Sequence, residues 1–496
     1  MKSKYIIIGL LLVFFASCKD DFLDLSSNES LTTATYFQTE DDFTAAVNGI
    51  YTPVRQWMGP LGDVGTSPSI MIGDMHSDLA RYYFNPNYRA GSDVENIADF
   101  VPEVDRFSSY WTEFYTWISR CNSVIGYIDD ASFDADTKSN LKGQALFFRA
   151  YSYWWLHRLY GQAVLHLEPV STLAETSKEL SDEAAVKAQI IADAGEAANL
   201  LLGKAAQQAG RVTKGAAYML LADVYMWYGE WANAESALKN VTGYSLLTNY
   251  ADIFNPANKN NAESIFEIQY SSASADYSSS FVYNMFPFPS TAEQVAVWTG
   301  VSNPEGLTEG EMMAVPTPEF LAAYEDGDAR YAATVQTVQN ADGVETPMCS
   351  KYLHPHSTFK QSDDDYFIYR YAETLLFMAE AINEQGNRID EAKGYLNQIR
   401  NRAGLENTTA SSQSELREAI LKERMIELAF EGNRWWDLVR TGSVQEVISS
   451  YGAKVKANPL DYYFVGSQAP VPTAFTDFST VFNLPDDEKL YNPYVD

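Results

Sequence analysis

The sequence predicts an all-α fold, a scaffold of paired helices interrupted by long loop-rich excursions that carry few short strands. Three observations predict it. Several long segments repeat apolar residues at helical spacing, and two windows match a helix-pair repeat. Two further stretches, about 59–104 and 250–365, are rich in Gly, Pro, Asn or Ser and lack clear periodicity. With 46% hydrophobic residues, the chain has ample material for a core.

The N-terminus has the pattern of a lipoprotein signal peptide over residues 1–17. Lys2 and Lys4 precede an apolar run that ends at Phe15 and is followed by Ala16, Ser17 and Cys18. The run is too short to span a bilayer comfortably. We expect the mature chain to begin at Cys18 and to be held in the membrane through lipid on that thiol. A plain cleaved secretory signal stays open, because Phe15 stands where such boxes prefer a small aliphatic residue.

The first helix is expected over about 39–58, where Phe43, Val47, Ile50 and Val54 form one apolar stripe. The polar segment before it is expected to be a loop. After the loop-rich stretch 59–104, helices are expected over about 108–128, 134–160 and 182–202, each with a core-facing stripe.

The next pair of helices has the spacing of a tetratricopeptide repeat, in which small residues let the helices approach and aromatic or leucine residues fill the gap. The matching positions of the first copy are Tyr218, Leu221, Ala222, Tyr225, Gly229, Trp231, Ala234 and Leu238. A second copy runs through Leu375, Met378, Ala379, Gly386, Ala392 and Leu396. Two copies are fewer than a free-standing solenoid needs, so the other helices must complete the stack. We therefore expect one domain over 18–496, with its helical scaffold at about 39–58, 108–250 and 365–445.

Charge and cysteine content exclude several classes of partner and site. The formal net charge of −31 becomes −33 once Lys2 and Lys4 are removed with the signal, and such a field repels nucleic acid. Cys121 and Cys349 have no zinc-type spacing and are expected to be small core residues, although a single disulfide stays open.

Candidate ligand-binding residues lie on or beside the loop-rich stretches, where burial is not guaranteed and where function concentrates. Flat aromatic faces suit sugar rings. The candidate set is Trp57, Asp74, Arg81, Tyr82, Tyr83, Tyr88, Tyr283 and Trp298. Tryptophans on the predicted helices are expected in the core instead.

Catalytic and metal motifs are scarce. The sequence has no GxSxG, HExxH or phosphate-loop motif, so we assign no catalytic residue, no cofactor and no metal site. His354-Pro355-His356 and the run Asp363-Asp364-Asp365 could hold a metal or calcium, but a solvated turn is favoured for each. A glycoside hydrolase stays open, because the separation of its two carboxylates is spatial and the chain has 66 acidic residues.

Short motifs spread over nearly the whole chain resemble those of the SusD/RagB family. They are Asp21-Phe22-Leu23-Asp24, Phe148-Arg149-Ala150-Tyr151, Arg370-Tyr371-Ala372-Glu373, Asn397-Gln398-Ile399-Arg400-Asn401-Arg402, Glu423-Arg424-Met425-Ile426-Glu427, Gly432-Asn433-Arg434-Trp435-Trp436-Asp437 and Tyr491-Asn492-Pro493-Tyr494. One departure is Gln162-Ala163-Val164-Leu165 after Tyr160-Gly161, where the family usually has Asp and then Val-Pro-Leu. Glu423, Arg424 and Glu427 are expected to pair along one helix, and Trp435-Trp436 to be packing residues rather than a sugar platform.

The resemblance implies a SusD-like, non-enzymatic lipoprotein on the outer surface of the outer membrane. Such a protein captures neutral oligosaccharide or polysaccharide and delivers it to a TonB-dependent transporter of the SusC type. Lys19-Asp20-Asp21 resembles the surface-export signal of such lipoproteins. A peptide-binding component of the same transporter type is the alternative, and a glycoside hydrolase is a more distant one.

Overall fold

The computed structural model describes residues 36–58, 68–84, 92–101, 108–307 and 314–495. Its first four long helices are α3 (Glu40–Met58), α6 (Ser108–Ile128), α7 (Ala135–Tyr160) and α8 (Glu183–Leu200), and each of α6, α7 and α8 packs on the one before it. The apolar stripe of α3 is fully buried, as predicted. Asp134 caps α7 by accepting from the Thr137 backbone nitrogen at 2.8 Å, and Gly161 ends it with a φ of 71°. The predicted bounds of these helices agree within two residues.

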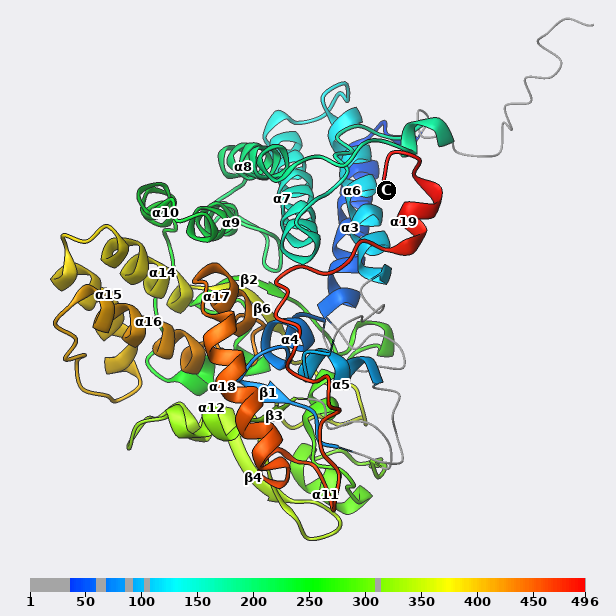
Figure 1. The fold of residues 1–496 in the computed structure, drawn as a ribbon. Coiled ribbons are helices and arrows are strands. Elements are labelled where there is room, and N and C mark those ends of the chain that lie inside the picture. Colours follow the sequence, from blue (N-terminus) through cyan, green and yellow to red (C-terminus); the bar gives the residue numbers. More distant parts are fainter. Residues whose placement is uncertain (1–35, 59–67, 85–91, 102–107, 308–313, 496) are drawn as a thin grey trace, which may run out of the picture.

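Two repeat-type helix pairs continue the stack. The first is α9 (Lys214–Trp227) with α10 (Trp231–Leu238), and the second is α14 (Tyr371–Glu384) with α15 (Ile389–Arg402). Because α10 packs directly on α14, the two copies are neighbours in space although more than a hundred residues separate them. Figure 1 shows the helices as an arc from α3 and α6 through α8 to α10 and on to α14, α15 and α16 (Gln413–Glu427). The last helices are α17 (Arg434–Arg440), α18 (Val444–Ala457) and α19 (Asp486–Tyr491).

The segment between the two copies is loop-dominated with short elements, as predicted, and lies at the lower side of the arc in Figure 1. Its strands take part in three two-stranded antiparallel sheets of the described chain: β3 (Val315–Pro316) pairs with β1 (Ala80–Arg81) of the first loop-rich stretch, β2 (Ser264–Ile268) with β6 (Tyr366–Arg370), and β4 (Val335–Gln339) with β5 (Glu345–Cys349). Its helices are α11 (Ala292–Thr299), α12 (Pro318–Ala323) and α13 (Tyr331–Thr334). Short 3₁₀ turns occupy Leu173–Thr176, Tyr250–Ile253, Pro256–Asn258, Ala275–Tyr277, Phe281–Met285 and Pro459–Tyr462.

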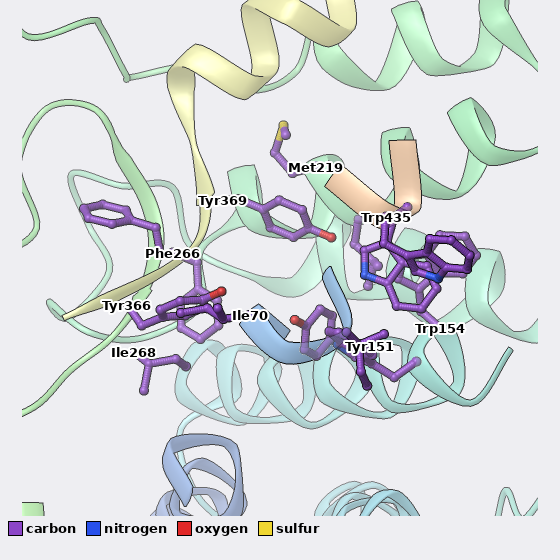
Figure 2. Close-up of a cluster of buried hydrophobic side chains, with 14 of the residues drawn as sticks. Ile70, Tyr151, Trp154, Met219, Phe266, Ile268, Tyr366, Tyr369 and Trp435 are labelled. Carbon is purple, nitrogen blue, oxygen red and sulfur yellow. The ribbon is translucent and has the colours of Figure 1, made fainter. Parts of the chain in front are cut away.

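The sheet β2–β6 joins the excursion to the helical stack. Figure 2 shows Phe266 and Ile268 of β2 and Tyr366 and Tyr369 of β6 above α7, which contributes Tyr151 and Trp154. Trp435 of α17 and Ile70 of the short helix α4 (Pro68–Ile70) complete this buried cluster. Its aromatic rings bury large apolar areas, and the cluster ties five distant parts of the chain together.

The first loop-rich stretch differs from the prediction. Residues 68–82 contain α4, a single π-helical turn (Met71–Met75) and β1, and all from 69 to 82 are buried. The backbones of Gly73 and Gly432 touch, since a Cβ on Gly73 would lie 2.1 Å from the Gly432 carbonyl oxygen. A short helix, α5 (Ser92–Ala98), follows. The expectation of a surface loop over 59–104 is therefore wrong for 68–82, because this segment threads beneath the C-terminal motif.

The cysteine prediction is confirmed: Cys121 and Cys349 are buried and free, so no disulfide joins them. Among the described residues, no helix combines the length and the apolar character that crossing a bilayer requires.

Candidate ligand-binding surface

Helix α11 places a tryptophan at the edge of the excursion. Thr291 starts the helix with a capping box to Gln294, and Gly300 ends it with a φ of 74°. Trp298 is half-buried, and its ring stands edge-on to the buried Phe286 with centroids 5.4 Å apart. The neighbouring Val297 is 77% exposed, so this face of the helix is open to solvent.

The β4–β5 hairpin is fixed against the start of α11. The Gln294 side-chain amide donates to the Gln339 carbonyl at 2.9 Å, and Asn340 donates to the Phe288 carbonyl at 2.8 Å. The hairpin turn carries Asp342. The pKa of Tyr83 is raised mainly by burial and in addition by the negative charge of Asp342.

Tyr83 is half-buried and stacks on Tyr463, with ring centroids 6.2 Å apart and planes 24° from parallel. Tyr463 is held in a left-handed conformation with a φ of 67°, and its hydroxyl donates to the Pro316 carbonyl of β3. Its own carbonyl accepts from the Phe84 backbone nitrogen at 3.1 Å. We call Tyr83, Trp298 and Tyr463 the aromatic rim. Half-exposed rings on a rigid frame are suited to stacking on flat apolar faces such as those of sugar rings.

The structure thus leaves Tyr83 and Trp298 partly exposed, each on a different segment. Tyr463 is absent from the sequence-based candidates, although it follows the Asn458-Pro459 helix end and is as loop-borne as the others. The same reasoning from aromatic residues in loops would have identified it.

Three other candidates, whose burial the sequence left open, are buried. Arg81 is 0% exposed and pairs with Asp99 at 3.0 Å, while the Tyr82 hydroxyl donates to the same carboxylate at 2.7 Å. Tyr283 is 1% exposed, and its hydroxyl lies 2.6 Å from Nε2 of His356. These side chains support the surface from beneath and offer no face for stacking.

Asp74, the remaining charged candidate, is also fully buried. Its Oδ2 accepts from the Gly432 backbone nitrogen at 2.9 Å, and its Oδ1 has no partner among the described residues. Burial raises the pKa of Asp74 to about 7, against a smaller opposing effect of the Gly432 hydrogen bond and of Lys351. Its position ties the 68–84 segment to the C-terminal motif.

Three further predictions fall outside the described residues. They concern Cys18, Tyr88 and the side chain of Trp57, of which only the helical backbone at the end of α3 is described.

The prediction of a solvated acidic turn at Asp363-Asp364-Asp365 is wrong. Asp364 is 1% exposed and lies 2.5 Å from Nδ1 of His354. Asp365 is 7% exposed, accepts from the Tyr270 backbone nitrogen at 2.8 Å and pairs with Lys259. Each carboxylate is used by a local protein partner. No cluster of three or more metal-ligating side chains occurs in the part of the chain that the structure describes.

The C-terminal motifs build a buried ionic network. Glu427 pairs with Arg370 at 2.6 Å, with Arg330 at 3.1 Å and with Arg402, and Arg370 pairs in turn with Glu431 at 2.7 Å. These three guanidinium groups hold the pKa of Glu427 far below its usual range despite its burial. The network joins α16, α15 and the β6–α14 junction, which gives the motifs a structural role.

The expectation that Glu423, Arg424 and Glu427 pair with one another along helix α16 is wrong. Arg424 does not pair with Glu423 or Glu427 but with Asp437 at 2.8 Å and Glu373 at 3.2 Å, on α17 and α14. Trp435 and Trp436 are 0% and 5% exposed, which confirms that they are packing residues.

Two protein-family models match this chain, one in its C-terminal part and one in its N-terminal part. A model of the SusD family matches residues 330–494, and a model described as "Starch-binding associating with outer membrane" matches residues 21–226. The SusD-like protein P25 of Formosa agariphila is 25% identical over 492 residues, covering 90% of this chain and 92% of that protein.

Solved structures share the fold. A laminarin-binding SusD-like protein superposes with a TM-score of 0.73 at 23% identity, covering 92% of this chain and 99% of that one. Surface glycan-binding protein A from Bacteroides thetaiotaomicron, solved in complex with laminarihexaose, gives 0.70 at 21% identity, covering 90% and 97%. With the buried C-terminal network and the helical arc, these matches lead to one conclusion: the chain belongs to the SusD/RagB family.

Proposed function

We propose that this protein is a surface lipoprotein of the outer membrane that captures neutral oligosaccharide or polysaccharide on the aromatic rim. The observation that carries the proposal is the placement of Tyr83, Trp298 and Tyr463, three half-buried rings on separate segments that are held by ring contacts and, for Tyr463, by a hydrogen bond to Pro316. Rings held in this way lose little conformational freedom when a sugar stacks on them. Two proteins of the same fold are named for laminarin or solved with laminarihexaose, which supports the same ligand class here.

The charge distribution favours neutral ligands. The formal charge of −31 disfavours polyanionic chains, and the negative charge of Asp342 in the hairpin turn raises the pKa of Tyr83. We expect the protein to bind such neutral ligands with micromolar to millimolar affinity, about −8 to −4 kcal/mol. Stacking and hydrogen bonds form there on a surface that stays open to water.

Delivery to a TonB-dependent transporter of the SusC type completes the proposal. Its support is the lipobox-like sequence ending at Cys18 and the matching model that describes association with the outer membrane. The protein binds and does not turn over its ligand in this proposal.

One experiment separates the candidate functions. The purified protein is titrated by calorimetry with neutral oligosaccharides, sulfated or uronic oligosaccharides and peptides, and each mixture is then examined by chromatography for cleavage products. Binding of neutral glycans without cleavage supports the proposal. Binding of peptides alone supports a peptide-binding component, and cleavage products identify a glycoside hydrolase.

A further inference from the structure

A cavity of about 100 Å³ shares no lining residue with the aromatic rim. Its walls come from the end of the buried 68–84 segment, from α5 and the residues after it, and from the C-terminal segment before α19. The side chains used below are His76, Asn96, Phe100, Asp477, Ser479 and Asn483.

His76 presents one unused ring nitrogen at this cavity. The residue is 6% exposed, and its Nδ1 lies 2.6 Å from the Ile97 carbonyl oxygen. Because a carbonyl only accepts hydrogen bonds, Nδ1 carries the proton and Nε2 is left as an acceptor. Nε2 has no partner among the described residues, and the ring lines the cavity.

The imidazole is fixed in position and in charge. Its ring stacks on Phe100 with centroids 4.0 Å apart and planes 22° from parallel, and it contacts Trp435 edge-on at 4.2 Å. Burial lowers the pKa of His76 to about 4, with a smaller opposing effect of Asp477. The ring is therefore neutral near pH 7, so Nε2 accepts a hydrogen bond and does not attract an anion.

The opposite wall of the cavity is polar, and most of its side-chain hydrogen-bonding groups have no partner among the described residues. The side-chain amides of Asn96 and Asn483 have no hydrogen-bond partner among the described residues. Asp477 accepts from the Ser479 backbone nitrogen at 2.9 Å through Oδ1 only, and Ser479 donates to the Val481 carbonyl at 2.6 Å.

Backbone hydrogen bonds hold this wall in place. Phe475 donates to the Asp99 carbonyl at 2.6 Å, and Phe482 donates to the Leu159 carbonyl of α7 at 2.7 Å. The C-terminal segment is thus tied to both the α5 region and the helical stack, which makes the cavity a formed site.

We propose that this cavity binds one neutral sugar ring, as a site separate from the aromatic rim. A sugar hydroxyl donates to Nε2 of His76, other hydroxyls exchange hydrogen bonds with Asn96, Asn483 and the free oxygen of Asp477, and a ring face lies on the aromatic side of the pocket. No Lys or Arg is among its lining residues, so it offers nothing to a phosphate or sulfate. The cavity has room for several water molecules and meets solvent at the exposed Ser479 and Asn483.

The test uses glucose, galactose and mannose as probes, with glycerol to detect nonspecific filling. Binding to the full-length protein is measured by saturation-transfer NMR and calorimetry, for the wild type and for Asn96→Ala and Asn483→Ala. Asn407→Ala, at an exposed position, is the matched control. We expect at least one sugar to bind with a millimolar dissociation constant and each cavity variant to weaken it about tenfold, as expected for loss of a hydrogen bond. Asn407→Ala should bind as the wild type does.

An NMR measurement on His76 in the wild-type protein tests the proposal even if a variant folds poorly. The ¹⁵N resonance of its Nε2 should shift on addition of the sugar and stay unchanged with glycerol. The proposal is overturned if none of the sugars binds, if glycerol competes equally, or if both cavity variants bind as tightly as the wild type. Trp298→Ala separates this site from the rim: it should weaken oligosaccharide binding there and leave the single-sugar affinity of the cavity unchanged.

Discussion

Arg370 and Glu427 form a buried ion pair, with 2.6 Å between Nη1 and Oε1 and side chains that are 1% and 0% exposed. Glu427 lies on α16 and Arg370 ends β6, so the pair joins the helical stack to the β2–β6 sheet. Taking charges out of water costs several kcal/mol per ion, and this cost is offset only while each charge keeps its partners. The frame beneath the ligand surface depends on this balance.

Removing the carboxylate charge of Glu427 should strongly destabilise the fold. We expect Glu427→Gln to lower the free energy of unfolding by about 3–5 kcal/mol at pH 7, because three guanidinium groups lose their shared anion. Urea unfolding measures this change in the free energy of unfolding. Glu418→Gln, at an exposed position of the same helix, is the control. The pKa of Glu427 is depressed in the folded state, so its contribution is present above the unfolded pKa of about 4.3 and is lost as pH falls below it. Equal losses of stability in Glu427→Gln and Glu418→Gln would contradict a stabilising role of the buried ionic network.

Asp74 should make stability fall as pH rises. Its folded pKa of about 7 lies above the ordinary value of 3.8, so its contribution is full below pH 3.8 and is lost as pH rises toward 7. Relative to Asp74→Asn, which keeps an acceptor for Gly432, the wild type should lose about 1.4 kcal/mol per pH unit inside that window. Urea unfolding at pH 5, 6, 7 and 8 gives the difference, with Asp390→Asn as an exposed control. If the difference in the free energy of unfolding between the wild type and Asp74→Asn does not change with pH, the burial of an ionisable Asp74 is contradicted.

The aromatic rim predicts a local loss of affinity. Trp298→Ala or Tyr463→Ala should weaken binding of a neutral oligosaccharide by about 1–3 kcal/mol, by analogy with bases stacked on aromatic side chains. Calorimetry measures the change, circular dichroism checks the fold, and Val297→Ala on the same helix is the control. Wild-type affinity in both variants, or affinity confined to sulfated or uronic chains, would rule out this surface.

Lipid anchoring rests on Cys18. Cys18→Ala should release the protein from the outer membrane or leave it unprocessed, because the thiol that carries the lipid is gone. Cell fractionation with mass measurement of the product tests this, and Ser17→Ala is a control that keeps the thiol. A Cys18→Ala protein that stays membrane-bound at the mature size would refute the anchor.

Association with a transporter is the remaining prediction. We expect a TonB-dependent protein of the SusC type to co-purify with this protein after gentle detergent extraction at native expression. The helical side of the fold, rather than the loop side, should form the contact. Cross-linking with mass spectrometry locates it. Recovery of the protein alone, with the transporter present in the same membrane, would count against the pairing.

The sequence by itself determined the helices and the helix pairs. Apolar periodicity depends on neighbours three or four residues apart, and this local signal sets α6 at 108–128 and places the end of α7 at Gly161. The C-terminal motifs were also recognisable from their residues, although not the partners of Arg424, which lie on other helices.

Burial of the loop residues was decided only by the tertiary structure. Arg81 and Tyr82 lie two residues or fewer from Tyr83 in the chain, yet the first two pair with Asp99 in the core while Tyr83 reaches the surface beside Tyr463. The partners are 17 to 380 residues away, and a segment without periodicity carries no signal of what will cover it. The helical scaffold therefore follows from the sequence, whereas the ligand surface follows from which distant segments meet, because exposure is a property of the packed chain.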